Sequence, residues 1–339
     1  MNLRIDPTAL PEETVIFGST AAMRSIRRRI DRALTSAEPV LIQGESGTGK
    51  EIVARFIHSR SNRSDAPFVK ANCAAVPASL LESELFGYQK GAFIEAQQDR
   101  SGLIELASGG TLFLDQIGEL EAKIQSKIFH LLRSDSFTPI GGSDERPGRV
   151  RLICATGGDL QNSADGAAFH GDLFRRIAGF SIHLVSLRDR KGDIPQLCEY
   201  FLHKLARQFG RSAPQLDEAT LRLLTEWDWP GNIRELENWI ARAVILGDTD
   251  VLAAELRRRI SSSIAQRHAR TGIAACKETL RRPVATSTVI LRTLRANRWN
   301  RRKTAEDLNM SYRSFLYKLR EVGLPHRRRG HRDFLPPAE

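Results

Sequence analysis

The chain has 339 residues, of which 41% are hydrophobic, enough apolar material for a folded protein of two or three domains. Its formal net charge of +11 is concentrated at one end, because residues 281–339 carry 15 basic and five acidic side chains. No apolar run of about 18 residues is present, and the N-terminal stretch lacks the apolar core of a signal peptide. A cytoplasmic protein with no membrane span is therefore expected, and its basic end predicts binding to a polyanion, most often nucleic acid.

The four cysteines, Cys73, Cys154, Cys198 and Cys276, are far apart and form no CxxC pair. This spacing predicts neither a zinc site nor a disulfide framework. We expect ordinary reduced thiols in the core, because a free cysteine behaves as a small apolar side chain.

Short apolar runs alternate with segments of helical period through the first 185 residues. The runs predict strands at 40–43, 68–70, 111–114, 151–155 and 181–185. Such alternation is typical of a parallel sheet with crossover helices. From residue 192 to 247 the strand signal stops, and helices punctuated by Trp229-Pro230-Gly231-Asn232 are expected instead.

The first predicted strand runs directly into a glycine-rich loop, Gly44-Glu45-Ser46-Gly47-Thr48-Gly49-Lys50-Glu51, and then into a helical pattern. In this context the N–H groups of the loop and of the helix N-terminus hold phosphates, and the lysine reaches the outer ones. Glu51 stands where the general pattern has a serine or threonine that binds magnesium. The loop predicts a phosphate-binding site.

A second carboxylate for a metal ion is expected at the end of another buried strand. Asp115, which ends the apolar run Thr111–Leu114, is therefore the candidate Mg²⁺ ligand. In ATPases with this kind of glycine-rich loop, the residue after the metal-binding carboxylate usually polarises the attacking water. In this chain that residue is Gln116. An amide can orient water but cannot accept its proton, so general-base assistance is predicted to be lost.

From residue 16 to about 247 the chain resembles the AAA+ domain of bacterial enhancer-binding proteins, the activators of sigma-54 RNA polymerase. The resemblance rests on the strings GESGTGKE, PFVKANCAAVPASLLESELFG, GGTLFLDQIGEL, LRDRKGDIPQL and WPGNIRELEN. It implies a ring with ATP and Mg²⁺ between subunits, and a loop of sequence GAFTGA that acts on sigma-54. The implied fold class is α/β, an AAA+ P-loop parallel sheet with a helical lid subdomain, followed by an all-α helix-turn-helix domain.

The same resemblance implies roles for individual residues. Lys50 and its loop would hold the phosphates, and Asp115 would hold the magnesium ion. Asn72 would be the switch residue that senses the water-polarising carboxylate. Arg234 would be the lid arginine that reads the nucleotide, and Arg176 would be one of two arginines that reach into the neighbouring subunit's site.

Four parts of this machinery depart from the family pattern. Gln116 replaces the water-polarising glutamate, His170 the first trans-acting arginine, and Gly157 the sensor asparagine. The GAFTGA loop reads Gly91-Ala92-Phe93-Ile94-Glu95-Ala96. Because the nucleotide loop is kept while these parts have changed, we expect ATP binding with weak or absent hydrolysis and a doubtful contact with sigma-54.

The C-terminal block reads as three short amphipathic helices joined by tight turns, with Ser311 before the last helix. It resembles the Fis-type helix-turn-helix that ends most enhancer-binding proteins, which implies double-stranded DNA as a partner. Phosphate contacts are expected from Arg301, Arg302 and the basic tail, and base contacts from Arg313, Ser314 and Tyr317. The other DNA-binding candidates on the last helix are Tyr312 and Lys318.

The expected domain boundaries are a short extension at 1–15, the AAA+ α/β subdomain at 16–186 and the helical lid at 187–247. A linker at 248–284, the helix-turn-helix at 285–325 and a basic tail at 326–339 follow. No receiver or ligand-sensing domain is expected before residue 16. Control would then come from expression level, a binding protein, a small ligand or pairing with another subunit.

The leading interpretation is a DNA-binding transcriptional regulator with an ATP-binding AAA+ domain. Two alternatives stay open at this point. One is an active sigma-54-dependent ATPase, and the other is a sigma-54-independent nucleotide-sensing regulator or repressor, for instance with a cyclic dinucleotide on the ring domain. Expected partners are double-stranded DNA and a ring formed with itself or with an intact family member, whereas a contact with sigma-54 RNA polymerase is left open.

Overall fold

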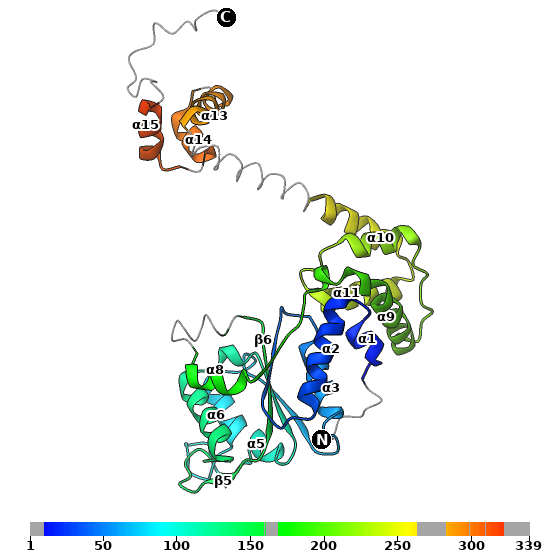
Figure 1. Cartoon of the computed structure of the whole chain (residues 1–339), viewed down its shortest axis with the longest axis vertical. Coiled ribbons are helices and arrows are strands. Elements are labelled where there is room, and N and C mark those ends of the chain that lie inside the picture. The colour runs from blue at the N-terminus through cyan, green and yellow to red at the C-terminus, as the bar shows by residue number, and fades with distance from the viewer. Residues whose placement is uncertain are drawn as a thin grey trace, which may run out of the picture. The chain divides into compact units, whose positions relative to one another are not determined.

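The computed structural model describes residues 10–158, 160, 169–262, 283–297, 299–308 and 310–321. The chain divides into two compact units, Met1–Leu256 and Arg257–Glu339 (Figure 1). The first unit holds a sheet and a group of helices that follow it, and the second ends in three short helices. Among the described residues, no helix has both the length and the apolar character needed to cross a bilayer.

A five-stranded parallel sheet forms the centre of the first unit, in the order β2-β3-β6-β1-β7. All five predicted strands are present, with ends that differ by at most two residues from the prediction. Their bounds are β1 (Val40–Gln43), β2 (Phe68–Asn72), β3 (Thr111–Asp115), β6 (Arg151–Thr156) and β7 (Phe180–His183). A separate antiparallel pair is formed by β4 (Ser136–Phe137) and β5 (Arg146–Pro147).

Helices cover both faces of the sheet (Figure 1). Strand residues alternate between the two cores: Leu41 faces one, and Val40 and Ile42 face the other. This alternation is what a strand buried on both faces requires. The helices on one face are α1 (Glu13–Phe17), α2 (Ala21–Leu34) and α3 (Lys50–Ser59), and on the other α4 (Ala78–Phe86), α5 (Leu103–Leu106), α6 (Ala122–Ser134) and α8 (Gly171–Ile177).

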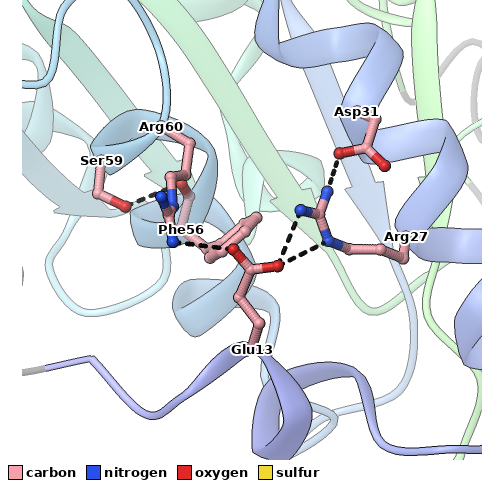
Figure 2. Close-up of polar contacts among 6 residues, drawn as sticks. All are labelled: Glu13, Arg27, Asp31, Phe56, Ser59 and Arg60. Atoms are coloured by element: carbon pink, nitrogen blue, oxygen red, sulfur yellow. Dashed lines mark hydrogen bonds and ion pairs between the residues drawn. The ribbon is translucent and has the colours of Figure 1, made fainter.

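One carboxylate joins the short helix α1 to α2 and to Arg60, the residue just after α3 (Figure 2). Glu13 Oε2 accepts hydrogen bonds from Arg27 Nε at 3.2 Å and Nη2 at 2.9 Å, and Glu13 Oε1 accepts one from Arg60 Nη2 at 2.9 Å. The Arg27 guanidinium lies 5.2 Å and 5.0 Å from the ring centroids of Phe17 and Phe56. Apolar packing and charge pairing therefore hold α1 against α2 and the end of α3.

Three helices follow the sheet and form the lid region, α9 (Ile194–Phe209), α10 (Glu218–Glu226) and α11 (Asn232–Leu246). Pro195 lies in the first turn of α9, where its missing N–H costs no hydrogen bond, and Gly210 ends the helix in a left-handed conformation. Between α10 and α11, the buried Trp229 donates its Nε1–H to Leu224 O at 2.7 Å. Residues 250–262 are also helical.

The C-terminal unit contains α13 (Pro283–Ala296), α14 (Arg301–Asp307) and α15 (Tyr312–Glu321). Asn300 caps α14 by accepting a hydrogen bond from Lys303 N at 3.2 Å. The three helices share a small apolar core of Ile290, Leu294, Ala305, Leu308, Phe315 and Leu319. The predicted three-helix pattern is thus present.

Cys73, Cys154 and Cys198 are buried free thiols, as expected from their spacing. Burial raises the pKa of Cys73 and of Cys198 to about 12, so neither thiol forms an appreciable amount of thiolate at neutral pH. The predictions for Cys276 and for the basic tail at 326–339 lie outside the described residues.

Candidate functional site

The glycine-rich loop joins the end of β1 to the start of α3, as the sequence predicts. Gly44 N donates to Thr156 O of β6 at 3.2 Å, so the loop begins at the carboxyl edge of the sheet. Lys50 Nζ donates to the loop carbonyls Gly44 O at 2.7 Å and Glu45 O at 2.9 Å. Burial lowers the pKa of Lys50, while Asp115 opposes that shift.

The lid holds the loop from its outer side. Ile233 N donates to Gly47 O at 2.9 Å, and Asn232 Nδ2 donates to Ser46 O at 3.0 Å. A Cβ at Gly47, where φ is +78°, would lie only 2.2 Å from Gly231 O. Glycine is therefore required at position 47 both by its left-handed backbone and by the closeness of the lid.

Two arginines of the LRDRKGDI string strengthen this contact. Arg188 Nη1 donates to Glu45 Oε2 at 2.9 Å, and Arg190 Nη2 donates to Thr48 O at 3.3 Å. Hydrogen bonds from Arg188 and Asn232 hold the pKa of Glu45 below its usual value. The family strings located this region, but its contacts with the loop join residues more than 140 positions apart, and no local pattern reveals them.

Arg234 also lies against the loop, as the resemblance implies for the lid arginine. Its Nη1 is 3.3 Å from Ser46 Oγ, and its charge contributes to the lowered pKa of Lys50. The predicted lid arginine and phosphate lysine are therefore close in space.

Asp115 ends β3, its charge acts on Lys50 of the loop, and Asn72 ends the adjacent β2 in register with it. Gln116 follows in the left-handed region with φ of +59°, and it precedes a turn of 3-10 helix. The predicted metal ligand, switch residue and water-orienting position therefore lie at the same edge of the sheet. Mg²⁺ is often held by one or two carboxylates together with phosphates and water, which suits a single aspartate here.

Lys70 is a residue of this edge that the sequence analysis missed. Its Nζ lies 3.8 Å from Asp115 Oδ2 and also pairs with Glu51 Oε2. Glu51 pairs with Arg55 Nη2 at 2.8 Å as well. Although burial favours the neutral acid, hydrogen bonds from Lys70 and Arg55 hold the pKa of Glu51 below its usual value. Glu51 is thus an ion-paired carboxylate.

The other three catalytic candidates take different positions. Gly157 follows β6, and a Cβ there would lie 3.9 Å from Gly44 O, so it adjoins the loop. The backbone N–H of His170, just before α8, donates to Gln125 Oε1 at 2.7 Å. Arg176 Nη1 lies 3.6 Å from Glu38 Oε2. The role of His170 and Arg176 in a neighbouring subunit's site stays a prediction.

The GAFIEA loop forms an exposed turn. It is closed by a hydrogen bond from Gly91 N to Ala96 O at 2.8 Å, and Phe93 packs edge-to-face on Tyr88 with ring centroids 4.8 Å apart. Ile94 is fully exposed. Glu95 is absent from the positive-φ positions of the described residues, so its replacement of glycine strains no backbone in this conformation. What has changed at the tip is its side chains, one apolar and one acidic.

On the helix-turn-helix, α15 buries Phe315 and Leu319 and exposes Tyr312, Arg313 and Tyr317. Arg302 on α14 is also exposed, and Arg301 is half-buried. The exposed face of α15 therefore carries three of the predicted DNA-contacting residues. The side chains of Ser314 and Lys318 lie outside the described residues.

Three family models match successive parts of this architecture. The sigma-54 interaction domain matches residues 16–183, the AAA+ ATPase lid domain residues 188–272, and the Fis family of bacterial regulatory proteins residues 287–321. The chain is 41% identical to the regulatory protein AtoC of Escherichia coli K12 over 314 residues, which cover 91% of this chain and 68% of AtoC. The chain belongs to the sigma-54 enhancer-binding proteins.

Two further comparisons describe this enhancer-binding protein's place in the family. It is 47% identical over 246 residues to the transcriptional activator HyfR of Escherichia coli K12, covering 73% of this chain but only 37% of HyfR. The crystal structure of NtrX from Brucella abortus in complex with ADP matches with a TM-score of 0.67 and 30% identity, over 91% of this chain and 69% of that one. The family combines an AAA+ domain with a Fis-type helix-turn-helix in DNA-binding, sigma-54-dependent transcriptional activators.

Proposed function

We propose that this enhancer-binding protein binds ATP and Mg²⁺ but hydrolyses ATP slowly or not at all. It would regulate transcription while bound to DNA, and its direct action on sigma-54 would be impaired. The observation that carries the proposal is Gln116, which directly follows Asp115 in a chain that keeps the glycine-rich loop and Lys50 between β1 and α3. The matched NtrX structures, in complex with ADP and with ATP, support nucleotide binding by analogy.

The residues present fit a bound nucleotide. The loop N–H groups and the first turn of α3 would hold phosphates, because these donors have no partner within the helix. Lys50 would exchange its two loop carbonyls for phosphate oxygens. Asp115 would hold Mg²⁺, whose charge would neutralise phosphate charge.

The loss of hydrolysis follows from two side chains. Gln116 can donate to or accept a hydrogen bond from water but cannot take its proton. At His170, a shorter imidazole with only two ring nitrogens replaces an arginine, whose planar guanidinium offers five N–H donors to phosphate oxygens. Each change is expected to lower the turnover on the order of 10²-fold or more.

The tip loop supports the second part of the proposal. The threonine-to-isoleucine change removes a hydroxyl from a fully exposed position, and Glu95 adds a negative charge. A surface that fitted GAFTGA would meet an apolar branched side chain and a carboxylate instead. We expect direct remodelling of sigma-54 polymerase to be weak.

ATP binding and ATP turnover of the purified full chain, measured in the same preparation, test the proposal. Binding is read by displacement of a fluorescent ATP analogue, and Lys50→Ala is the control that should abolish it. We expect saturable binding of ATP by the unaltered chain together with a turnover at least about 10²-fold below that of AtoC assayed beside it. Turnover comparable to AtoC would overturn the proposal.

A second candidate is a mixed ring with an intact family member. It is favoured by the division of the implied site, since Lys50, Asp115 and Gln116 belong to one subunit, whereas Arg176 would serve the next. This chain could then complete a partner's site with Arg176 and anchor the ring on DNA. Co-expression with intact enhancer-binding proteins of the same cell, followed by pull-down and a promoter assay, tests this: no mixed complex and no promoter effect would leave a homo-oligomer.

A further inference from the structure

Helix α2 carries an exposed row of arginines that the nucleotide site does not use. Arg24, Arg28 and Arg32 follow one another at i, i+4 and i+8, so they lie along the same side of the helix over about 12 Å. Arg29 is also exposed. The opposite side of α2 buries Met23, Ile26, Ile30 and Ala33 against the sheet.

The charges of this row are not compensated by neighbouring acids. The only acidic residue of α2, Asp31, pairs with Arg27, and the same Arg27 pairs with Glu13 (Figure 2). Arg28, Arg29 and Arg32 have no ion pair in the part of the chain that the structure describes. The unit as a whole, Met1–Leu256, carries a formal net charge of −4, so this face concentrates positive charge on an otherwise slightly acidic unit. A row of guanidinium groups without ion pairs indicates an anionic partner.

The surface between the arginines is open to a close contact. Ala21 and Ser25, which lie on the same side of α2, are small and exposed. Duplex DNA carries one phosphate per about 3.4 Å of axis along each strand, so a 12 Å row can face about three phosphates of one strand. Guanidinium groups bind such oxygens by charge-assisted hydrogen bonds.

We propose that the exposed face of α2 is a second DNA-binding surface, which contacts the phosphate backbone of a duplex without reading its bases. DNA is favoured over an acidic protein because the Fis-type module in the same chain would keep duplex DNA at a high effective concentration. The inference rests on the proposed function in one respect, which is that the Fis-type module binds duplex DNA and so brings it near α2. The surface adds affinity that is independent of base sequence.

The test compares two triple variants of the full chain. Arg28→Gln, Arg29→Gln and Arg32→Gln neutralise the α2 face, and Arg133→Gln, Arg149→Gln and Arg207→Gln remove the same charge from exposed positions elsewhere. Binding of a fluorescent mixed-sequence duplex of about 40 base pairs is measured against salt concentration. In the α2 variant, the magnitude of the slope of log K against log salt should decrease by about two to three, which is about 0.9 for each lost phosphate contact. In the control variant the slope should change little.

The two variants are also prepared with Arg302→Gln and Arg313→Ala, which weaken the helix-turn-helix. The α2 substitutions should still reduce the slope when Arg302→Gln and Arg313→Ala are present. If only the prediction for the helix-turn-helix is wrong, Arg302→Gln and Arg313→Ala will leave DNA binding unchanged while the α2 substitutions still reduce the slope. Thermal unfolding and ATP-analogue binding confirm that the variants are folded. An unchanged slope in the α2 variant, or an equal change in the control, would overturn the proposal.

Discussion

His58 is a fully buried side chain of α3 whose Nδ1 lies 2.9 Å from Thr111 Oγ1. Burial, assisted by the charges of Arg151 and Arg55, lowers its pKa to about 4, although a contact with the Ala66 backbone opposes the shift. The neutral form is therefore the one that the folded protein holds. Because an unfolded chain protonates histidine near pH 6.5, its stabilising contribution is complete above that pH and is lost as the pH falls toward 4.

Because of His58, we expect the first unit to become less stable as the pH falls. Between pH 7.5 and 5 the free energy of unfolding should fall by about 2 kcal/mol on account of His58. His58→Gln, which cannot titrate, should show a correspondingly smaller dependence on pH. Denaturant unfolding followed by circular dichroism at both pH values measures the difference, and an identical pH dependence in the two proteins would contradict the assignment.

Gln116 is a residue whose role depends on a single functional group. Its position after Asp115 and its left-handed backbone place it beside the predicted metal ligand, and a glutamate would occupy the same space. The exchange removes one proton-accepting group while leaving the packing of the strand unchanged. This is why the predicted effect is on chemistry and not on stability.

At the scale of elements, the beginning of α11 is the part of the lid that fastens the loop. Asn232 is fully buried with φ of +54°, its Oδ1 accepts from Leu187 N at 2.8 Å, and its Nδ2 donates to Glu45 and Ser46. One side chain therefore connects the lid, the loop and the segment before α9.

Two substitutions separate the backbone strain from the hydrogen bonds. Asn232→Gly keeps the left-handed backbone but loses the side chain, and we expect local opening of α11 to become easier by about 2 kcal/mol. Asn232→Ala should cost about 1 kcal/mol more, because alanine is strained at this φ. Hydrogen exchange of the first turn of α11 measures both, and equal protection in the two variants would contradict the strain.

The strands and helices could be predicted largely from local patterns. Buried parallel strands are short apolar runs, so their cores were located and only their ends differed, as for β7, which begins at Phe180 and ends at His183. The contacts that complete the site could not be predicted in this way. Asn232 with Ser46 and Lys70 with Asp115 join distant segments, and polar side chains give no periodic signal of their partners.

In the molecule as a whole, nucleotide binding is expected in the first unit, and base-specific DNA recognition in the second. The exposed Arg313 on α15 is predicted to read a base, and the exposed Arg302 on α14 to contact a phosphate. A good base contact is worth about 1–3 kcal/mol of discrimination, whereas a phosphate contact carries no sequence information directly.

The full chain should therefore respond differently to the two substitutions. With a duplex selected from random sequences and a mismatched duplex, Arg313→Ala should lower the ratio of the two affinities about tenfold or more. Arg302→Gln should lower the affinities for the two duplexes by the same factor. Fluorescence anisotropy at fixed salt gives both affinities, and a loss of discrimination on Arg302→Gln alone would show that the two roles are reversed.

The rate of the chemical step of ATP hydrolysis shows whether the changed residues limit turnover. Single-turnover conversion of bound ATP to ADP excludes product release, and the unaltered chain is compared with a variant that carries Gln116→Glu, Gly157→Asn and His170→Arg. We predict that the variant reacts at least about 10²-fold faster and that Gln116→Glu alone recovers only part of the gain. Equal rates in the unaltered chain and the triple variant would show that Gln116, Gly157 and His170 do not limit hydrolysis.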